Sequence, residues 1–353
     1  MTNTLEPAAF PEELLALLAI PGVSGYERPV VDHLRASLPD GVDAHVDAIG
    51  NLTATFGAGD PHLLLIVHTD EVGFVVSGVR PDGALYLTAV GHWDLAAVGG
   101  SQVDVHTSGG AVPGVVITVP PHLDRGLSGP PAWLEGDQVV VDVGTESAEA
   151  TAALGVRVLD SVTLARQHAV LPGGHLVARG LDNRFGCYLL LELARGLAQR
   201  PPTAGSVTLA WSSQEEVGFR GPKALAHRSN YDAVLAIDAY PADRRPGARL
   251  ADDAVRLGAG PVLRGVDLTG VGSLRFVRGI ERVARDRGLP VQPAYAAGHN
   301  QASVFPTSFA AALDLPIAYL HAGVESLHRR DLDAAGALLR AIVSLPTWED
   351  LWL

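Results

Sequence analysis

The sequence predicts an α/β protein: a mixed, largely parallel sheet with helices on both faces, interrupted by an inserted all-β domain. Two observations carry this prediction. Apolar strand-like runs alternate with helix-like segments towards both ends of the chain, a pattern typical of parallel sheets covered by helices. Between them, from about residue 73 to 164, short Val- and Thr-rich runs follow one another without a convincing amphipathic helix. That texture is typical of a barrel or sandwich.

The first 72 residues contain the opening elements of the α/β domain. Residues 11–38 look helical, with a break at Ile20–Gly25 where Pro and Gly interrupt the pattern. Short strands are expected at Ala44–Val46 and Leu52–Phe56. The run His62–Val67 is almost entirely apolar, which indicates a strand buried on both faces of the sheet.

The inserted domain is expected to consist of short strands separated by Gly, Pro and Asp. Arg80–Gly83 has the composition of a hairpin turn. The expected strands are Phe74–Val79, Leu85–Val90, Gln102–His106, Val115–Val119, Gln138–Val143 and Ser161–Ala165. We therefore assign residues 1–72 and 165–353 to the α/β domain and residues 73–164 to the inserted β-barrel-like domain.

After residue 165 the alternation of helices and strands returns. The expected helices are 182–198, 221–228, 271–287, 301–312 and 331–344, and the expected strands are 206–213, 233–238, 291–295 and 315–320. These elements complete the sheet begun before the insertion.

Composition excludes several classes of function. The chain has 26 Lys and Arg against 39 Asp and Glu, a formal charge of −13, so its surface would repel nucleic acid and anionic lipid. The single cysteine, Cys187, excludes an intramolecular disulfide framework. Residues 1–7 lack the basic start and apolar stretch of a signal peptide, and no run is long enough to span a membrane. We expect a soluble, cytoplasmic protein.

Residues of the types that bind metals stand where four of the apolar runs end. Because the carboxyl ends of parallel strands meet at one edge of an α/β sheet, such groups can converge on one crevice. Asp182 is a further candidate at the start of the helix expected at 182–198. The strand-end candidates are His68 and Asp70 after Leu63–Val67, Glu215 and Glu216 after Val207–Trp211, Asp238 after Ala233–Ile237, and His321 after Ile317–Leu320.

Each candidate has an ordinary structural interpretation when taken alone. Asp182 could cap its helix, and His68 and His321 could be polar residues at the ends of buried strands. Glu215 and Glu216 could be a solvated pair. Their conjunction favours a metal site, because two imidazoles and several carboxylates, with a spare glutamate, suffice for a dinuclear centre.

The residue types fit two neighbouring divalent cations. Their mutual repulsion requires an anionic bridge, which a carboxylate with two oxygens can supply. Asp182 is the natural choice because no other central carboxylate is left over. Mixed His and carboxylate ligands suit zinc, cobalt or manganese better than calcium or magnesium. Asp70 lies on the same side of an extended strand as His68 and can orient its imidazole. Of Glu215 and Glu216, one can bind metal while the other acts as base.

Seven segments, in order and spread over almost the whole chain, give the sequence a specific resemblance. It resembles the tetrahedral aminopeptidases, a family of dinuclear metallopeptidases that includes glutamyl and leucyl aminopeptidases and cellulase M-like proteins. The segments are Ile20–Glu27, Asp47–Asn51, His68–Phe74, Pro120–Leu123, Leu181–Gly186, Gln214–Gly221 and Leu320–Glu325.

The resemblance implies which residues hold two divalent metal ions, expected to be zinc or cobalt. His68 and Asp238 would hold one ion, and Glu216 and His321 the other. Asp182 would bridge them.

The resemblance also implies a zinc-peptidase-like fold and hydrolysis of the N-terminal bond of peptides. A hydroxide bridging the metals would attack the scissile carbonyl, with Glu215 as general base and Asp70 supporting His68. The inserted domain would mediate assembly into dimers and then a twelve-subunit shell.

Three departures from the family's pattern bear on substrate preference. Gly298-His299-Asn300 stands where the family usually has Gly-Thr-Asp. Ala239–Asp243 replaces a stretch that usually contains His and Asp, and Ala322-Gly323 replaces Ser-Pro.

Three other functions remain as alternatives. Dinuclear deacylases and carboxypeptidases generally carry their extra domain after the glutamate pair, whereas here it lies between His68 and Asp182. A glycosidase would need a carboxylate pair working without metal, which leaves His68 and His321 without a purpose. A catalytically inactive oligomeric binding protein would not be expected to retain the whole ligand set.

Overall fold

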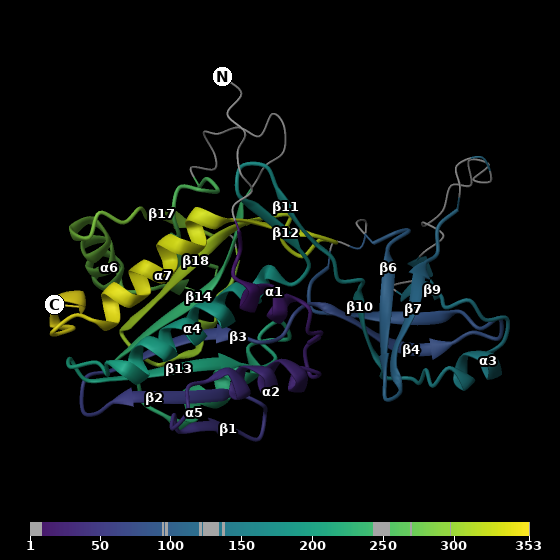
Figure 1. The fold of residues 1–353 in the computed structure, drawn as a ribbon, viewed down its shortest axis with the longest axis horizontal. Coiled ribbons are helices and arrows are strands. Elements are labelled where there is room, and N and C mark those ends of the chain that lie inside the picture. Colours follow the sequence, from purple (N-terminus) through teal and green to yellow (C-terminus); the bar gives the residue numbers. More distant parts are fainter. Residues whose placement is uncertain are drawn as a thin grey trace. The chain divides into compact units, whose positions relative to one another are not determined.

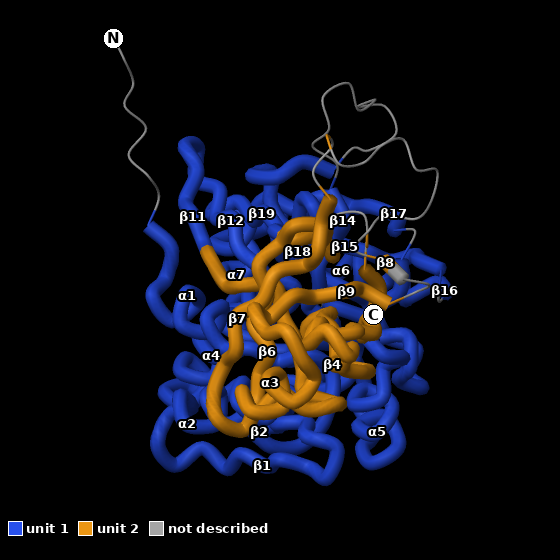
Figure 2. Tube along the Cα trace, turned by 90° about the vertical axis from the view of Figure 1, so that its right-hand side faces the viewer, with its two compact units in different colours: residues 1–70, 168–320, 324–353 blue, residues 71–167, 321–323 orange. Residues whose placement is uncertain are grey.

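The computed structural model divides the chain into two compact units, which Figure 2 shows in different colours. Unit 1 comprises residues 1–70, 168–320 and 324–353, and unit 2 comprises residues 71–167 and 321–323. The structure describes residues 9–93, 95, 98–119, 122, 134–135, 138–242, 255–268, 270–296 and 298–352. Of the motif residues noted above, Pro120, Pro121, Leu123 and Asp243 lie outside the described residues.

Unit 1 is built on one large mixed sheet (Figure 1). Its main strands are β1 (Ala44–Val46), β2 (Leu52–Gly57), β13 (Ser206–Ser212), β3 (His62–His68), β14 (Ala233–Ala242), β18 (Phe309–Ala318), β19 (Glu325–His328), β12 (His175–Ala178) and β11 (His168–Leu171), in that spatial order. The four central strands β13, β3, β14 and β18 are mutually parallel. The strands on either side of these four pair antiparallel.

A second group of strands extends the sheet beside β18. It consists of β15 (Val262–Asp267), β16 (Gly270–Val271) and β17 (Gln292–Tyr295). Strand β15 pairs antiparallel with β18 and parallel with β17.

Helices cover both faces of this sheet. One face packs against α1 (Glu12–Leu18), α2 (Arg28–Ser37), α4 (Leu181–Gln199), α6 (Leu274–Asp286), α7 (Arg329–Val343) and α8 (Glu349–Trp352). The other packs against α5 (Arg220–Arg228) and the 3₁₀ helix η2 (Gln301–Val304). Both faces of strand β3 are buried, which explains why the residues between His62 and His68 are all apolar. Leu63, Leu65 and Val67 enter the first core, and Leu64 and Ile66 enter the second. The predicted α/β class is confirmed.

The helix expected at 301–312 is wrong. Residues Gln301–Val304 form a single 3₁₀ turn, which ends before Pro306, because a proline disfavours helical backbone in the residue that precedes it. The Ala-rich run that follows belongs to β18, between β14 and β15 in the sheet. Tertiary pairing thus overrides the helix propensity of alanine there. Strands β11, β12, β15, β16 and β19 were not predicted.

Unit 2 contains a separate sheet that closes on itself. Its strands are β5 (Leu85–Val90), β4 (Gly73–Val79), β10 (Ser161–Leu164), β6 (Gln102–Thr107), β7 (Gly110–Val116), β9 (Gln138–Asp142) and β8 (Leu134–Glu135), in spatial order. An additional pairing of β5 with β9 makes the sheet barrel-like. Its core is formed by inward-facing aliphatic residues and Phe74.

Three details of unit 2 differ from the predictions, of which one is the two-residue strand β8, which was not expected. The strand expected at 115–119 is found earlier in the chain, as β7 at Gly110–Val116. Its residues Gly110–Val115 pair with β6. A short helix, α3 (Ala148–Ala153), is also present and is capped by the hydroxyl of Ser147. Its sequence has no apolar periodicity, and Thr151 is its one buried residue, so the pattern could not predict it.

No helix among the described residues is long and apolar enough to cross a membrane.

Candidate metal centre

The candidate ligands of unit 1 gather at the carboxyl ends of the central parallel strands. His68 is the last residue of β3, and Glu215 and Glu216 follow the end of β13. Asp238 lies on β14, level with His68. Ala236 and Ile66, which stand two residues before Asp238 and His68, are register partners. Parallel pairing therefore brings together side chains that are distant in the sequence.

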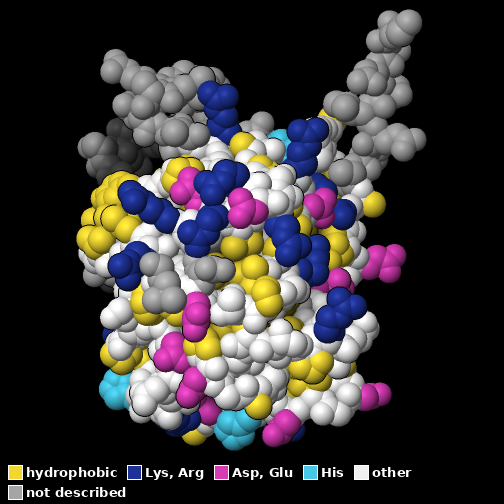
Figure 3. Space-filling view, turned by 90° about the vertical axis from the view of Figure 1, so that its left-hand side faces the viewer, with side chains coloured by type: hydrophobic (Ala, Val, Ile, Leu, Met, Phe, Trp, Pro, Cys, Tyr) yellow, Lys and Arg dark blue, Asp and Glu magenta, His cyan; other side chains and the backbone are white. Residues whose placement is uncertain are grey.

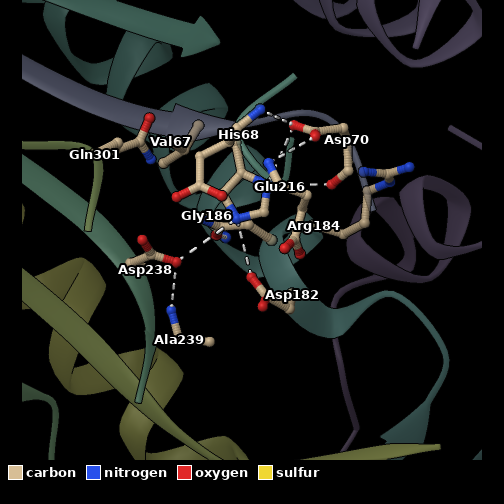
Figure 4. Close-up of polar contacts among 12 residues, drawn as sticks. Val67, His68, Asp70, Asp182, Arg184, Gly186, Glu216, Asp238, Ala239 and Gln301 are labelled. Atoms are coloured by element: carbon tan, nitrogen blue, oxygen red, sulfur yellow. Dashed lines mark hydrogen bonds and ion pairs between the residues drawn. The ribbon is translucent and has the colours of Figure 1, made fainter. Parts of the chain in front are cut away.

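His68 lies at the centre of the cluster, with carboxylates directed at its ring (Figure 4). Its Nε2 lies 3.1 Å from Asp182 Oδ1 and 3.6 Å from Asp238 Oδ1. Two groups, His68 with Asp182 and Glu216, and His68 with Glu215 and Asp238, each have ligand atoms within 4.8 Å of one another. All of these residues except the half-buried Glu216 are buried.

Asp70 lies behind the imidazole and is wholly buried. Its Oδ1 is 3.6 Å from His68 Nδ1, and its backbone carbonyl is 3.1 Å from the same nitrogen. The Asp70 carboxylate also accepts hydrogen bonds from the backbone N–H groups of Glu215 and Glu216. A single carboxylate thus orients the histidine and holds the turn that carries both glutamates.

Asp182 is held by the irregular first turn of α4. Its backbone is non-helical and its peptide bond to Asn183 is cis. The Asp182 N–H donates to Glu325 Oε2 at 3.1 Å, and Arg179 donates to the other oxygen of Glu325 at 3.2 Å. The Asn183 side chain donates to the Ile237 carbonyl, one residue before Asp238. These bonds place Asp182 beside β14, so it is not an ordinary N-cap.

The charges of the cluster perturb each other strongly. Burial by itself lowers the pKa of His68, but Glu215, Asp182 and Asp238 together raise that pKa well above its usual value. Burial also raises the pKa of Glu215 well above its ordinary value, and the nearby Asp238 and Glu216 add to this effect. Carboxylates so concentrated around one imidazole favour a bound cation.

The donor set therefore fits divalent metal. One imidazole nitrogen and several carboxylate oxygens, buried and within coordinating reach of one another, match the ligands of zinc, cobalt and manganese. His321, the remaining predicted ligand, is grouped with unit 2 and is absent from both ligand groups found among the described residues. Its role stays a prediction.

Sequence reasoning assigned no role to several residues that support the cluster. Ser24 Oγ donates to Asp70 Oδ2 at 2.7 Å. Arg184 Nη1 donates to the Thr69 carbonyl at 2.5 Å, next to Asp70. Ser24, Arg184 and Glu325 all lie in segments that carry the family resemblance, so their place in those segments was the available signal.

Comparison with known proteins is consistent with this geometry. The family model for M42 glutamyl aminopeptidase matches residues 50–338. The chain belongs to the M42 glutamyl aminopeptidase family. This confirms the resemblance seen in the sequence and makes the protein a metal-dependent aminopeptidase. Neither the deacylase nor the inactive binding protein is favoured.

Individual M42 relatives and related structures support the assignment. The glutamyl aminopeptidase of Lactococcus lactis is 31% identical over 262 residues, covering 72% of each chain. The lysyl aminopeptidase of Pyrococcus furiosus is 27% identical, covering 94% of this chain and 96% of the relative. The structure of the Pyrococcus horikoshii TET1 peptidase, which can assemble into a tetrahedron or a large octahedral shell, has a TM-score of 0.86. It is 35% identical, covering 94% of this chain and 98% of the other.

Proposed function

We propose that this M42 enzyme removes the N-terminal residue of peptides at the cluster around His68. The observation that carries the proposal is the convergence of Asp182 and Asp238 on His68 Nε2, with Glu215 and Glu216 in the same cluster. A metal-dependent aminopeptidase needs such a site. Apart from Asp182, which lies in the first turn of α4, the residues of the cluster lie at the carboxyl ends of strands, where ligands bind in α/β folds.

The proposed ligands divide between two metal ions. His68 and Asp238 would hold one ion, Glu216 and His321 would hold the other, and Asp182 would be shared by both. Zinc and cobalt are the proposed metals. The two ligand groups of unit 1 support the convergence of His68, Asp182, Glu216 and Asp238 on one place. The division of these residues between two ions, and the role of His321, rest on the family resemblance. When bound, two such ions supply Lewis acidity and lower the pKa of water enough for attack at neutral pH.

Glu215 is the proposed general base. Its side chain is buried in the cluster, and its backbone is fixed by the hydrogen bond from its N–H to Asp70. From there the carboxylate can take a proton from the attacking water and return it to the leaving amine. Asp70 keeps His68 in the orientation that presents Nε2 to Asp182 and Asp238.

Self-association is proposed for the inserted domain. Residues 73–164 fall within the separately packed unit 2, which has its own core. The Pyrococcus horikoshii relative can assemble into a tetrahedron or a large octahedral shell. We therefore propose dimers that assemble into a dodecamer, in the cytoplasm. Size-exclusion chromatography with light scattering would test the stoichiometry.

The decisive experiment is hydrolysis of a panel of aminoacyl-p-nitroanilides by the purified enzyme. Zinc, cobalt or manganese is added, a chelator serves as control, and each substrate is run beside its N-acetylated form. Metal-dependent cleavage of only the free-amine substrates, lost in Glu215→Gln, is expected. Preferential cleavage of the acetylated substrates would instead identify a deacylase.

A further inference from the structure

Three successive backbone N–H groups in the turn after β13 are held by two buried carboxylates. The Gln214 N–H donates to Glu27 Oε1 at 3.0 Å. The next two, those of Glu215 and Glu216, donate to Asp70 Oδ1 and Oδ2 at 2.9 and 3.1 Å. The turn that carries the proposed base and a proposed metal ligand is thus fixed at three successive residues.

The carboxylate of Glu27 serves this turn and not its own helix. Glu27 is the N-cap residue of α2, yet its side chain makes no capping bond there. Instead Oε1 accepts the N–H groups of Gly25, at 2.8 Å, and of Gln214, which is 187 residues away. Only 5% of Glu27 is exposed, and burying a carboxylate is unfavourable unless it is hydrogen-bonded.

The turn has a backbone conformation that needs such support. Gln214 has a φ of 54°, in the left-handed region, which is strained for a residue with a side chain. Residues held in this region persist when their surroundings over-determine them. Loss of the hydrogen bond that the Gln214 N–H donates to Glu27 would therefore let Gln214 relax and shift the two glutamates that follow it.

We propose that Glu27 is a positioning residue, which fixes Gln214 so that Glu215 and Glu216 face the metal cluster. The loop that contains it contributes a second contact, because the Ser24 hydroxyl donates to Asp70 Oδ2. The inference rests on the proposed function of the cluster. Glu27 acts through the turn, so it is not itself a catalytic residue.

The test compares Glu27→Ala and Glu27→Gln with a matched control, Asp331→Ala. Asp331 is also a buried carboxylate that accepts two backbone N–H groups, those of Gly258 and Gly260, and it is not part of the ligand groups. Each variant is assayed for kcat and KM well below its unfolding temperature. Metal affinity is measured separately by competition with a chromophoric chelator, without substrate.

Glu27→Ala is expected to lower kcat about 30- to 100-fold with KM changed less than about threefold, because misplaced reacting groups chiefly slow the chemical step. Its metal affinity should fall about tenfold. Glu27→Gln keeps an acceptor oxygen, so its kcat and its metal affinity should both stay within about threefold of wild type. Asp331→Ala should lose stability while kcat and metal affinity stay within about twofold of wild type.

Two outcomes overturn the inference: Glu27→Ala behaving like Asp331→Ala, or Glu27→Gln as impaired as Glu27→Ala. A wild-type enzyme inactive on every aminoacyl substrate contradicts the proposed function instead. In that case the chelator competition still decides whether Glu27 positions Glu216.

Discussion

The thiol of Cys187 donates a hydrogen bond to the backbone carbonyl of His68, with 3.2 Å between sulfur and oxygen. The carbonyl of Cys187 in turn accepts the indole N–H of Trp211, also at 3.2 Å. Helix α4, which begins beside the proposed bridging residue Asp182, is therefore fastened to the ends of both β3 and β13. The only cysteine of the chain is part of the support beneath the proposed metal centre.

The first prediction concerns the reactivity of this thiol. Burial raises the pKa of Cys187 to about 11, and the reactive species is the thiolate. The folded enzyme should therefore react negligibly with Ellman's reagent at pH 8, whereas the guanidinium-unfolded chain should release one equivalent of chromophore. Rapid reaction of one thiol per folded chain would show that the site is open.

The second prediction concerns the proposed bridge. Asp182→Asn removes the negative charge that offsets the repulsion of two cations, so metal content should fall and activity should drop about 100-fold or more. The exposed Asp286→Asn on α6 is the matched control and should keep both. Metal analysis beside peptidase assays gives the answer, and full metal content in Asp182→Asn would exclude a bridging role.

The third prediction concerns removal of the metals. Without cations, the buried carboxylates of Asp182, Glu215 and Asp238 repel each other, and ligand binding to the folded state is lost. Chelation should lower the melting temperature by several degrees, at roughly 1–2 °C per kcal/mol for a chain of this size. Zinc or cobalt should restore it and calcium should not. An unchanged melting temperature after complete metal removal would speak against the site.

The fourth prediction concerns pH and Asp331. Burial raises the pKa of Asp331 to about 6 from 3.8, so between these values the folded state binds the proton more tightly than the unfolded state. The contribution of Asp331 to stability should therefore fall as the pH rises from about 4 to 6, by about 3 kcal/mol in total, and stay level above that. In Asp331→Asn this contribution disappears. Thermal unfolding of both proteins across this pH range measures it; parallel profiles would contradict the assignment.

The fifth prediction concerns an ion pair inside unit 2. Arg166 donates to Glu71, and both side chains are largely buried. Arg166→Ala should destabilise the protein by about 3–5 kcal/mol, since it removes the cation from a buried carboxylate. Arg157→Ala, an exposed residue of the same unit, should change stability by less than about 0.5 kcal/mol. Equal unfolding temperatures for the two variants would show that the pair contributes little.

The elements that could be predicted from the sequence are those whose structure leaves a local pattern. The run before His68 indicated a strand because both its faces are buried, and such a strand is apolar at every position. The helix expected at 301–312 was wrong because Ala311 and Ala312 pair with Leu235 and Ala236 of β14 in the sheet. A contact with a distant strand leaves no local signal in the sequence. Strand β16 was missed because no periodic pattern distinguishes two residues.

The sequence by itself determined the α/β class, through the alternation of strand-like and helix-like segments. It also determined which chemical groups stand at the ends of the buried strands, and hence the expected metal chemistry. Only the tertiary structure decided which of them meet: His68 with Asp182 and Asp238, and Glu27 with Gln214. The physical reason is that burial and strand formation leave a local periodic pattern, whereas these contacts join distant segments. They depend on strand order, register and the conformation of single turns, which no local pattern encodes.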